Sequence, residues 1–519
     1  MATTEQTLTE GREDVDTPIV PMIIRGEVIT DHLVELKGRG DSLTFRTPDP
    51  AFYSGRLPLR SRADLQDLQT LPFEEILDFL HQLGERLDVT KNEHMQFARE
   101  LTYATSPHTT SLIKNAFNGI PHMFNRDIVR ERAERSVGLA HLNGWTESEL
   151  ADGTRLRVRA FGARSLHIIP GNSPLGAAQA IIRNAFTRSD CLIKTPSNSP
   201  FVAAAIAQTM CEMDPDHPVT KHVAVAYWRG GDTELERAIY QPHCVEKIIA
   251  WGGFASVKHV TQYIQPGLEL ISLDPKYSGS VVQLSAIEDE ETARDVALRI
   301  AVDVGTANQT GCSCSRFVYV VADGASDALT RTNRLGELVY EELVGLPEGM
   351  SSPAKSFDSK LRASIDAARL QDDWYHVVGG EAGEGCVIVS QLPAPVDFLS
   401  LLADRSVNLI PVDSIDQVFP RFDAYTQTIG VWPEEFKDRI VDIAPLYGVQ
   451  RFVSLGYSAN HTGAGPHDGL ELERRMCKWI IDQRSQPIPI APSRSEDRIN
   501  YEMFTPATLE AVRAQAKEW

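Results

Sequence analysis

Cys312 is the residue of this sequence best placed to act as a nucleophile. It lies in a polar loop of small residues, 306–315, between a predicted amphipathic helix and a predicted apolar strand. A thiolate in such a loop can attack a carbonyl carbon, and free backbone N–H groups can stabilise the oxyanion that forms. Cys314 leaves an alternative open, because both thiols could instead be small buried residues or a redox pair. The elements around the loop must decide between these interpretations.

The composition allows those elements to build a deep site. The chain has 519 residues, 42% hydrophobic and 24% charged, so we expect a globular protein of about two to four domains. Its 51 basic and 71 acidic residues give a formal net charge of -20. Such a charge repels phosphate backbones, so no nucleic acid partner is expected, although a local basic patch for one cofactor phosphate remains open.

The cysteines and the first residues indicate the compartment. Seven scattered cysteines, an odd number, suit reduced thiols better than a disulfide framework. No CxxC pair or His/Cys cluster has zinc spacing, so no metal site is predicted. Residues 1–16 are polar and acidic, unlike a signal sequence, and no apolar run is long enough to span a membrane. We therefore expect a cytoplasmic protein without a membrane span.

Four regions are predicted along the chain. Residues 1–150 form a mostly helical region that packs on the second region, and one of its helices begins near Pro72. Residues 151–273 alternate strand and helix signals, which indicates a parallel sheet covered by helices. Residues 274–445 form a second α/β block that contains Cys312, and 446–519 return to the first block.

The strand and helix signals of the second region have a clear order. Strands are predicted at 166–169, 191–194, 223–228 and 247–251, and helices at 175–186, 200–210 and 233–240. Ligands bind such sheets at the carboxyl ends of the strands. The segments that follow these strands are therefore the candidate site, and they are 169–174, 194–197, 228–232 and 251–253.

The block around Cys312 has the same character. A helix over 293–304 precedes the cysteine loop, and strands are predicted at 317–321, 387–390, 407–412 and 428–432. A break at Ser351-Ser352-Pro353 is followed by a polar stretch to about Asp373, which we expect to cover the surface.

Taken in order, these motifs resemble the aldehyde dehydrogenase superfamily, and within it the bacterial acyl-thioester reductases typified by the reductase of the luminescence fatty-acid reductase complex. The resemblance covers roughly 155–480. It implies an aldehyde dehydrogenase-like α/β fold, with a Rossmann-type cofactor domain over 151–273, a catalytic domain bearing Cys312, and an oligomerisation arm. The alternating segment near 153–162 is the candidate arm, and a homo-oligomer is expected.

The resemblance assigns roles at the strand ends. Asn172 matches the asparagine that holds the oxyanion together with the N–H of the nucleophile, although a helix-capping role is the alternative. Lys194 would reach the adenosine ribose or its phosphate. Ser197 replaces a glutamate that binds the ribose hydroxyls in NAD-preferring members, and Arg229 could add positive charge. NADPH is therefore expected rather than NADH, unless Lys194 and Arg229 are ordinary surface charges.

Further positions are assigned to the cofactor by the same resemblance. Gly252 and Gly253 match the glycine-rich turn that lets the pyrophosphate approach the backbone, although a simple tight turn also explains two glycines. Pro170, in the turn that holds Asn172, is placed with the cofactor. Asp404 lies about where the superfamily has a glutamate that anchors the nicotinamide-side ribose.

One departure from the superfamily predicts the outcome of the reaction. Aligning Lys276 with the lysine of the hydrolytic enzymes places Ser272 where they carry a glutamate general base. Serine cannot activate water as a carboxylate does, so an acyl group on the cysteine is protected from hydrolysis. Glu269 in a shifted register is the alternative base, and it would restore ordinary aldehyde oxidation.

Two further features belong to the reductases that the chain resembles. The Asn-Gln-x-x-Cys spacing selects Cys312 over Cys314, which is a neighbour able to form a regulatory link. A Gly-Pro-His-Asp-Gly segment contains His467, which could assist thiol exchange or could be structural.

The predicted function is NADPH-dependent reduction of an acyl thioester to the aldehyde through an acyl group on Cys312. The acyl donor is a fatty acyl-CoA or an acylated carrier or synthetase protein. Three alternatives stay open: an NAD(P)-dependent aldehyde dehydrogenase that makes the free acid, a cofactor-independent cysteine acyltransferase or thioesterase, and a non-catalytic scaffold.

Overall fold

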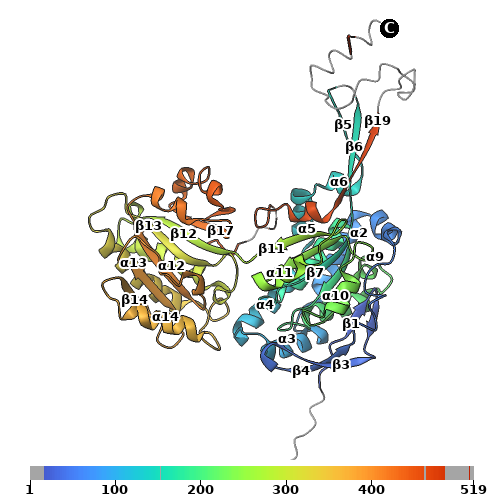
Figure 1. Ribbon diagram of the computed structural model, residues 1–519, viewed down its shortest axis with the longest axis horizontal. Helices are drawn as coiled ribbons and strands as arrows, with labels where there is room; N and C mark the ends of the chain where they lie inside the picture. Colours follow the sequence, from blue (N-terminus) through green and yellow to red (C-terminus); the bar gives the residue numbers. More distant parts are fainter. Residues whose placement is uncertain (1–16, 152–153, 461–462, 464, 485–512, 515–519) are drawn as a thin grey trace, which may run out of the picture.

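The protein is built from two lobes and a projecting arm (Figure 1). The computed structural model describes residues 17–151, 154–460, 463, 465–484 and 513–514. Each lobe is built on a seven-stranded sheet, and the arm is a sheet of three strands. Within the described residues, no helix is long and apolar enough to cross a membrane.

The sheet of the first lobe has the strand order β11-β10-β7-β8-β9-β1-β2, and the strands from β11 to β9 are parallel. The predicted strands of this region are confirmed. They are β7 (Arg164–Ile168), β8 (Asp190–Lys194), β9 (Val223–Ala226) and β10 (Lys247–Trp251), and β11 (Glu269–Leu273) lies at the edge.

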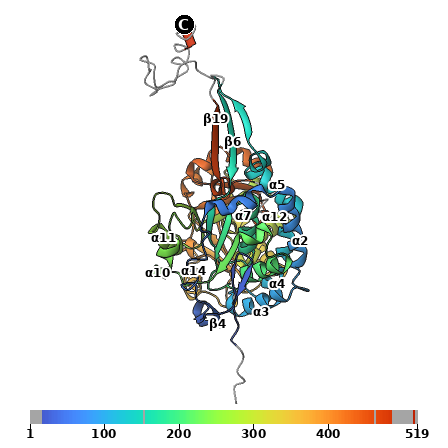
Figure 2. The same cartoon turned by 90° about the vertical axis from the view of Figure 1, so that its right-hand side faces the viewer.

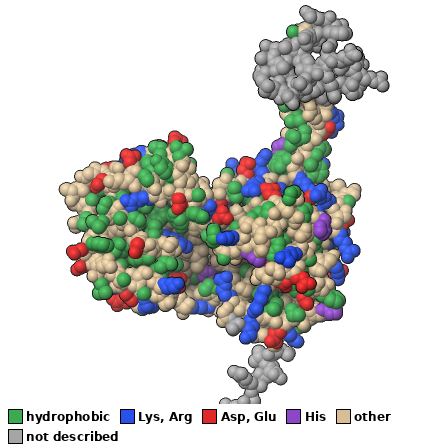
Figure 3. Space-filling model, in the orientation of Figure 1, with side chains coloured by type: hydrophobic (Ala, Val, Ile, Leu, Met, Phe, Trp, Pro, Cys, Tyr) green, Lys and Arg blue, Asp and Glu red, His purple; other side chains and the backbone are tan. Residues whose placement is uncertain are grey.

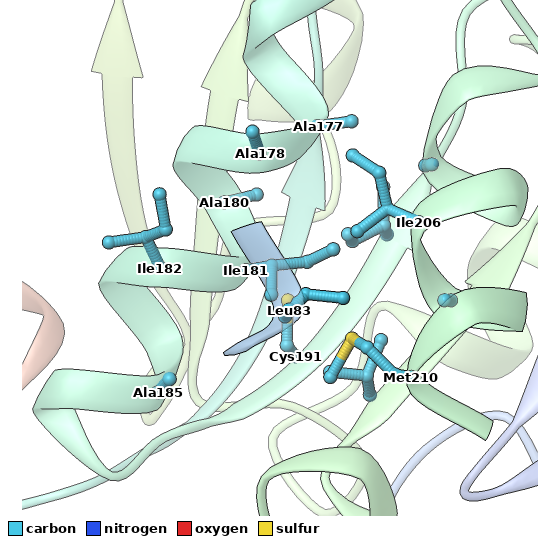
Figure 4. Close-up of a cluster of buried hydrophobic side chains, with 14 of the residues drawn as sticks. Leu83, Ala177, Ala178, Ala180, Ile181, Ile182, Ala185, Cys191, Ile206 and Met210 are labelled. Atoms are coloured by element: carbon cyan, nitrogen blue, oxygen red, sulfur yellow. The ribbon is translucent and has the colours of Figure 1, made fainter. Parts of the chain in front are cut away.

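Helices cover both faces of this sheet because alternate side chains of each strand point to opposite sides. Cys191 and Ile193 of β8 pack against α7 (Leu175–Thr187) and α8 (Val202–Met213), where Ile181, Ile206 and Met210 fill the core shown in Figure 4. Leu192 points to the other face and packs with residues of α10 (Thr233–Ile239). The helices predicted at 175–186, 200–210 and 233–240 are thereby confirmed.

The N-terminal region contains more strand than we predicted. Its helices include α2 (Phe73–Arg86), α3 (Glu93–Thr105), α4 (Thr110–Met123) and α5 (Arg126–Ser136). Before them, β1 (Met22–Ile24) pairs antiparallel with β9, and β2 (Glu27–Ile29) completes the edge of the sheet. A separate hairpin joins β3 (Leu33–Lys37) to β4 (Thr44–Pro48). These strands have only three to five residues, too short for a periodicity signal.

The sheet of the second lobe has the order β14-β15-β16-β13-β12-β17-β18. The predicted strands correspond to β13 (Ser315–Val321), β15 (Cys386–Ser390), β16 (Ser406–Val412) and β17 (Thr426–Trp432). The predicted helix is α12 (Glu290–Gly305), which packs with α13 (Ala328–Gly345) on one face through residues such as Val296, Ile300 and Leu338.

The polar stretch after Ser351 is not only surface. It contains α14 (Ser359–Arg369), whose Leu361 and Ile365 are fully buried against Ile388. The antiparallel edge strand β14 (Tyr375–Gly379), the central strand β12 (Tyr277–Gln283) and the edge strand β18 (Arg451–Ser454) complete the sheet.

The arm consists of β5 (Thr146–Glu149), β6 (Arg155–Phe161) and β19 (Lys478–Arg484), with β6 in the middle. It projects from the first lobe, as both ribbon views show (Figures 1 and 2). The alternation predicted near 153–162 is therefore a strand, although residues 152 and 153 lie outside the described residues. On the arm, Ile480 and Ile481 are 42% and 60% exposed.

Candidate active site

A cleft of about 1740 Å³ runs along the junction of the two lobes. A space-filling view shows the surface hollowed at this junction (Figure 3). The cleft is lined by the segments that follow β7, β8, β9, β10 and β11, and by the cysteine loop of the second lobe. It brings together Asn172, Lys194, Arg229, Gly253 and Cys312, which are distant in sequence.

Cys312 faces the cleft and is bonded to residues of neighbouring strands in its own lobe. Nε2 of Gln427, on β17, lies 3.2 Å from Sγ of Cys312 and donates a hydrogen bond to it. The carbonyl oxygen of Cys312 accepts a bond of 2.7 Å from the hydroxyl of Ser278, which itself accepts from the N–H of Thr428. Burial and the charge of Asp468 raise the pKa of the thiol, whereas the bond from Gln427 lowers it.

The backbone before Cys312 is strained. Ala307, Asn308 and Gln309 have φ values of 50°, 51° and 62°, in the left-handed region that non-glycine residues rarely adopt. Side chains hold them there. Oδ1 of Asn308 accepts the N–H of Ser352 at 2.8 Å, and the amide of Gln309 exchanges hydrogen bonds with the backbone of Ser406 at 2.8 and 2.9 Å. Asn308 and Gln309 therefore shape the loop and do not contact the reacting sulfur.

Cys314 is a buried neighbour. Its side chain is only 2% exposed and its thiol donates to the carbonyl oxygen of Thr306 at 3.3 Å. Burial raises the pKa of Cys314 to about 12. A thiol with that pKa is almost wholly protonated at neutral pH, so Cys312 is the better nucleophile of the two.

Asn172 lies beside the cysteine loop. Its Nδ2 donates a 3.0 Å hydrogen bond to the carbonyl oxygen of Thr310, two residues before Cys312. The backbone oxygen of Asn172 is 2.7 Å from Nε2 of His108, which is buried. An amide nitrogen carries two hydrogens, so Asn172 retains one donor for an oxyanion in the cleft. It does not cap α7, which has no side-chain cap.

A histidine and a carboxylate complete the side of the cleft near Cys312. Nε2 of Gln427 contacts Oδ1 of Asp468 as well as the cysteine sulfur. Nδ1 of His467 lies 3.4 Å from the same carboxylate oxygen, and the His467 ring packs 5.6 Å from that of Trp251. Burial opposes the charge of Asp468, but bonds from His467 and Gln427 hold its pKa below the usual value. The carboxylate is therefore ionised at neutral pH.

Trp251 connects this group to a buried ion cluster. The guanidinium of Arg183 lies 4.8 Å from the Trp251 ring, and its Nε is 3.0 Å from Oε1 of Glu473. Arg132 pairs with the same carboxylate oxygen at 2.8 Å. Burial and the charge of Arg132 lower the pKa of Arg183 to about 9. The single carboxylate of Glu473 thus fastens α5, α7 and the chain before the arm.

The other end of the cleft is basic. Lys194, Ser197 and Arg229 line it together with Pro170. Nζ of Lys194 lies 5.5 Å from the centre of the Trp228 ring, and burial lowers the pKa of Lys194 to about 8. Arg229 is exposed. These side chains line the same cleft, and their role in binding a cofactor phosphate stays a prediction.

The glycines after β10 leave room for a ligand. A Cβ on Gly253 would meet no protein atom within 4 Å, and one on Gly252 would only touch Ser256 at 3.4 Å. Gly253 is the N-cap of α11 (Phe254–Thr261) and no side chain caps that helix. Its first N–H groups are therefore open to an anion such as a pyrophosphate. The residues present fit a dinucleotide at this position.

Three other predicted positions lie differently. Ser272 lies on β11, opposite Ala250 of β10. The described lining of the cleft begins one residue later, at Leu273, and does not include Ser272. Glu269 begins β11, about 13 Å further from the cleft at strand spacing, and it pairs with Lys247 and Arg475. Glu269 is therefore not available as a general base in this structure.

Asp404 is also absent from the described residues that line the cleft. It is half-buried in the turn before β16, with a left-handed φ of 50°, and burial with the nearby charge of Asp358 raises its pKa. Asp404 lies near Asp358, at the start of α14, and not against the described lining of the cleft.

Several site residues were not predicted. Gln427, Ser278, His108 and Asp468 contact Cys312 or Asn172 directly or through one residue. Gln427 and Ser278 lie on neighbouring strands of the second sheet, in segments that read as ordinary strand sequence. Asp468 follows His467 in the predicted segment, so only its role was missed.

Solved structures identify the fold. The chain superimposes on lactaldehyde dehydrogenase from Escherichia coli with a TM-score of 0.66 at 14% identity, covering 90% of this chain and 99% of that one. It superimposes equally on NADP-dependent glyceraldehyde-3-phosphate dehydrogenase from Bacillus halodurans, complexed with NADP, at 13% identity over 89% and 98% of the two chains. The protein has the aldehyde dehydrogenase fold, with a cysteine facing the cleft between its lobes.

Sequence comparison then gives the family. Residues 68–479 match the acyl-CoA reductase (LuxC) family, so the chain belongs to it. It is 25% identical over 445 residues to long-chain acyl-protein thioester reductase 2 of Photobacterium leiognathi, covering 82% of this chain and 87% of that protein. It is 26% identical over 482 residues to the long-chain acyl-protein thioester reductase of Photorhabdus laumondii, covering 90% and 94%.

Proposed function

We propose that this protein reduces an acyl thioester to the aldehyde with NADPH, through an acyl group held on Cys312. The observation that carries the proposal is the position of the Cys312 sulfur in the same cleft as the glycines after β10 and the basic group at Lys194. A thiol and a dinucleotide site that share one cleft allow transfer of hydride to an acyl carbon on that thiol.

The first half of the reaction is thiol exchange. Cys312 loses its proton and the sulfur attacks the thioester carbonyl carbon. The carbon–sulfur bond to the donor then breaks, and the donor leaves as a thiol after taking up a proton. The second N–H of Asn172 and the backbone N–H of Cys312 are the donors proposed for the oxyanion of the tetrahedral intermediate. Gln427 stabilises the thiolate that must form first.

The second half needs hydride, which the dinucleotide supplies when bound. Gly252, Gly253 and the open end of α11 would hold its pyrophosphate, and Lys194, Ser197 and Arg229 its adenosine side. The same oxyanion donors serve again when hydride reaches the acyl carbon. Collapse of that intermediate releases the aldehyde and returns the Cys312 thiolate. Preference for NADPH rests on Ser197, since no carboxylate at that position repels a ribose phosphate.

The two positions considered from the sequence for a general base, Ser272 and Glu269, bear on protection of the acyl group from water. Glu269 is paired at the far end of β11, and Ser272 lies outside the described lining of the cleft, so neither residue is placed to activate water. The relatives are named for reducing long-chain acyl-protein thioesters. We propose an acylated protein or an acyl-CoA as donor here, and a homo-oligomer joined through the arm of β5, β6 and β19.

Paired cysteine variants test the proposal. Wild-type protein with a long-chain acyl-CoA and NADPH is expected to form aldehyde and to take up a radiolabelled acyl group. Cys312→Ser should lose both activities by at least about a thousandfold. Cys314→Ser should retain most of each, because Cys314 is buried. Acyl labelling that survives in Cys312→Ser and disappears in Cys314→Ser would contradict the assignment.

A second function is favoured by one observation. The carboxylate of Asp468 reaches the sulfur through Gln427, and a base so placed could activate water and give the free acid. Product analysis decides between the two. NADP-dependent conversion of aldehyde into acid that disappears in Asp468→Asn would establish the oxidation. Aldehyde formed from thioester by the same variant would establish the reduction.

A further inference from the structure

The hairpin loop between β3 and β4 lies on the adenosine end of the cleft. The N–H of Gly38 closes the loop onto the carbonyl oxygen of Leu43 at 2.8 Å. The N–H of Arg39 then donates 3.2 Å to the carbonyl oxygen of Ser197. A Cβ on Gly38 would stand only 3.3 Å from the same oxygen, so glycine permits this close contact. The loop is thus fixed directly on the residue that the resemblance links to the adenosine ribose.

This loop adds two cations to the cleft. Lys37 and Arg39 line it beside Lys194, Ser197 and Arg229, and both are exposed. The guanidinium of Arg39 pairs with no carboxylate among the described side chains. A group of four basic residues contrasts with the formal charge of -20 for the whole chain. Such a local excess of positive charge suits an anionic ligand.

The acids that line the cleft are elsewhere. Asp274 follows β11, and Asp468 and Glu473 follow β18. Three strand spacings, about 14 Å, separate β11 from β8, which carries Lys194. Asp274 is therefore too far away to neutralise Lys194. Asp468 and Glu473 are paired elsewhere, with His467 and with Arg132 and Arg183.

We propose that Arg39, supported by Lys37, is a specificity-determining residue that binds the phosphate monoester on the adenosine ribose of the ligand. The inference rests on the proposed function, because a nucleotide must enter the cleft. Guanidinium offers a planar pair of donors that fits a phosphate, and it keeps its charge at all physiological pH values. NADP carries such a phosphate at the ribose 2′ position and CoA carries one at the 3′ position.

The test is calorimetric binding of nucleotide fragments to the full chain, without turnover. The probes are adenosine 2′,5′-bisphosphate, adenosine 3′,5′-bisphosphate and 5′-AMP. Wild-type protein is expected to bind the 2′,5′-bisphosphate more tightly than 5′-AMP. In Arg39→Ala that advantage should fall roughly tenfold to hundredfold, with 5′-AMP changed less than about twofold. Arg39→Lys should keep part of the advantage.

Two further variants sharpen the result. Arg60→Ala, an exposed arginine of the same region outside the cleft lining, should change none of the affinities. Ser197→Glu places a carboxylate against the loop and should weaken only the ribose phosphates. An Arg39 effect confined to the 3′,5′-bisphosphate would assign the site to CoA instead of NADP.

Equal affinities of wild type and Arg39→Ala for both bisphosphates would overturn the inference. An equal loss for all three probes would do the same, since it would mean a general effect. Failure of the proposed function looks different, because Arg39-dependent binding of a bisphosphate would persist in a protein that forms no aldehyde from acyl thioester and NADPH.

Discussion

Gln427 donates from Nε2 to the sulfur of Cys312 at 3.2 Å, and the same nitrogen contacts the carboxylate of Asp468. One amide therefore links the thiol to a negative charge from a segment more than 150 residues further along the chain. The amide stabilises a thiolate, whereas the carboxylate opposes it. The two partners should shift the reactivity of Cys312 in opposite directions.

Replacing Gln427 by leucine should raise the pKa of Cys312, because the thiolate loses a donor. The midpoint of the pH profile of alkylation by iodoacetamide should then lie on the order of one pH unit above that of wild type. The measurement is the pH profile of inactivation. Gln371→Leu, on the exposed surface of the same lobe, is the control and should leave the profile unchanged. An unchanged pH profile in Gln427→Leu would contradict the role of Gln427 in stabilising the thiolate.

Replacing Asp468 by asparagine should have the opposite effect. The loss of a neighbouring negative charge lowers the pKa of Cys312, so alkylation should begin at lower pH. Asp274→Asn is a matched control, because Asp274 also lines the cleft but has no contact with Gln427. Equal shifts of the pH profile in both variants would mean that any negative charge in the cleft raises the pKa of Cys312, and that the contact through Gln427 has no special effect.

Gly253→Val should abolish binding of NADPH without harming the fold. A Cβ at this position meets no protein atom within 4 Å, so the new side chain should extend into the cleft where the pyrophosphate is proposed. Binding is measured by quenching of protein fluorescence and folding by the thermal midpoint. Gly55→Val, at another glycine with open space, should preserve both. Unaltered affinity in Gly253→Val would place the dinucleotide elsewhere.

Glu473→Gln should destabilise the first lobe by about 3 kcal/mol, because it leaves the buried guanidinium of Arg183 and the partly buried one of Arg132 without their carboxylate. The thermal midpoint of unfolding should fall by several degrees. Glu471→Gln removes a carboxylate that is 66% exposed and should change the transition by less than one degree, roughly. Equal effects of the two variants would show that the cluster contributes little.

Much of the site could be predicted because parallel strands deliver their ends to one edge of a sheet. Strong apolar runs located β7, β8, β9 and β10, and the segments after them contain Asn172, Lys194, Arg229 and Gly253. Cys312 was identified from its loop, and the structure separates it from Cys314 by burial. Family resemblance supplied the roles.

The remaining contacts depend on pairing that no local pattern encodes. Gln427 contacts Cys312 because β17 lies beside β12 in the second sheet. Arg39 contacts Ser197 because the loop of the β3–β4 hairpin bonds to the segment that follows β8. Asp404 is assigned only by its approximate place in the resemblance, and it lies in a turn outside the described lining of the cleft. Within α14, Leu361, Ile365 and Ala368 do have helical spacing, but the charged residues between them hid it.

The order of the chain determines when this enzyme can be completed during synthesis. The middle strand of the arm, β6, pairs with β19, which is translated more than 300 residues later. The same late segment contains Asp468, which contacts Gln427 beside the thiol. It also contains Glu473, the carboxylate of the ion cluster. A nascent chain on the ribosome therefore carries Cys312 in an unfinished environment until β19 has left the exit tunnel.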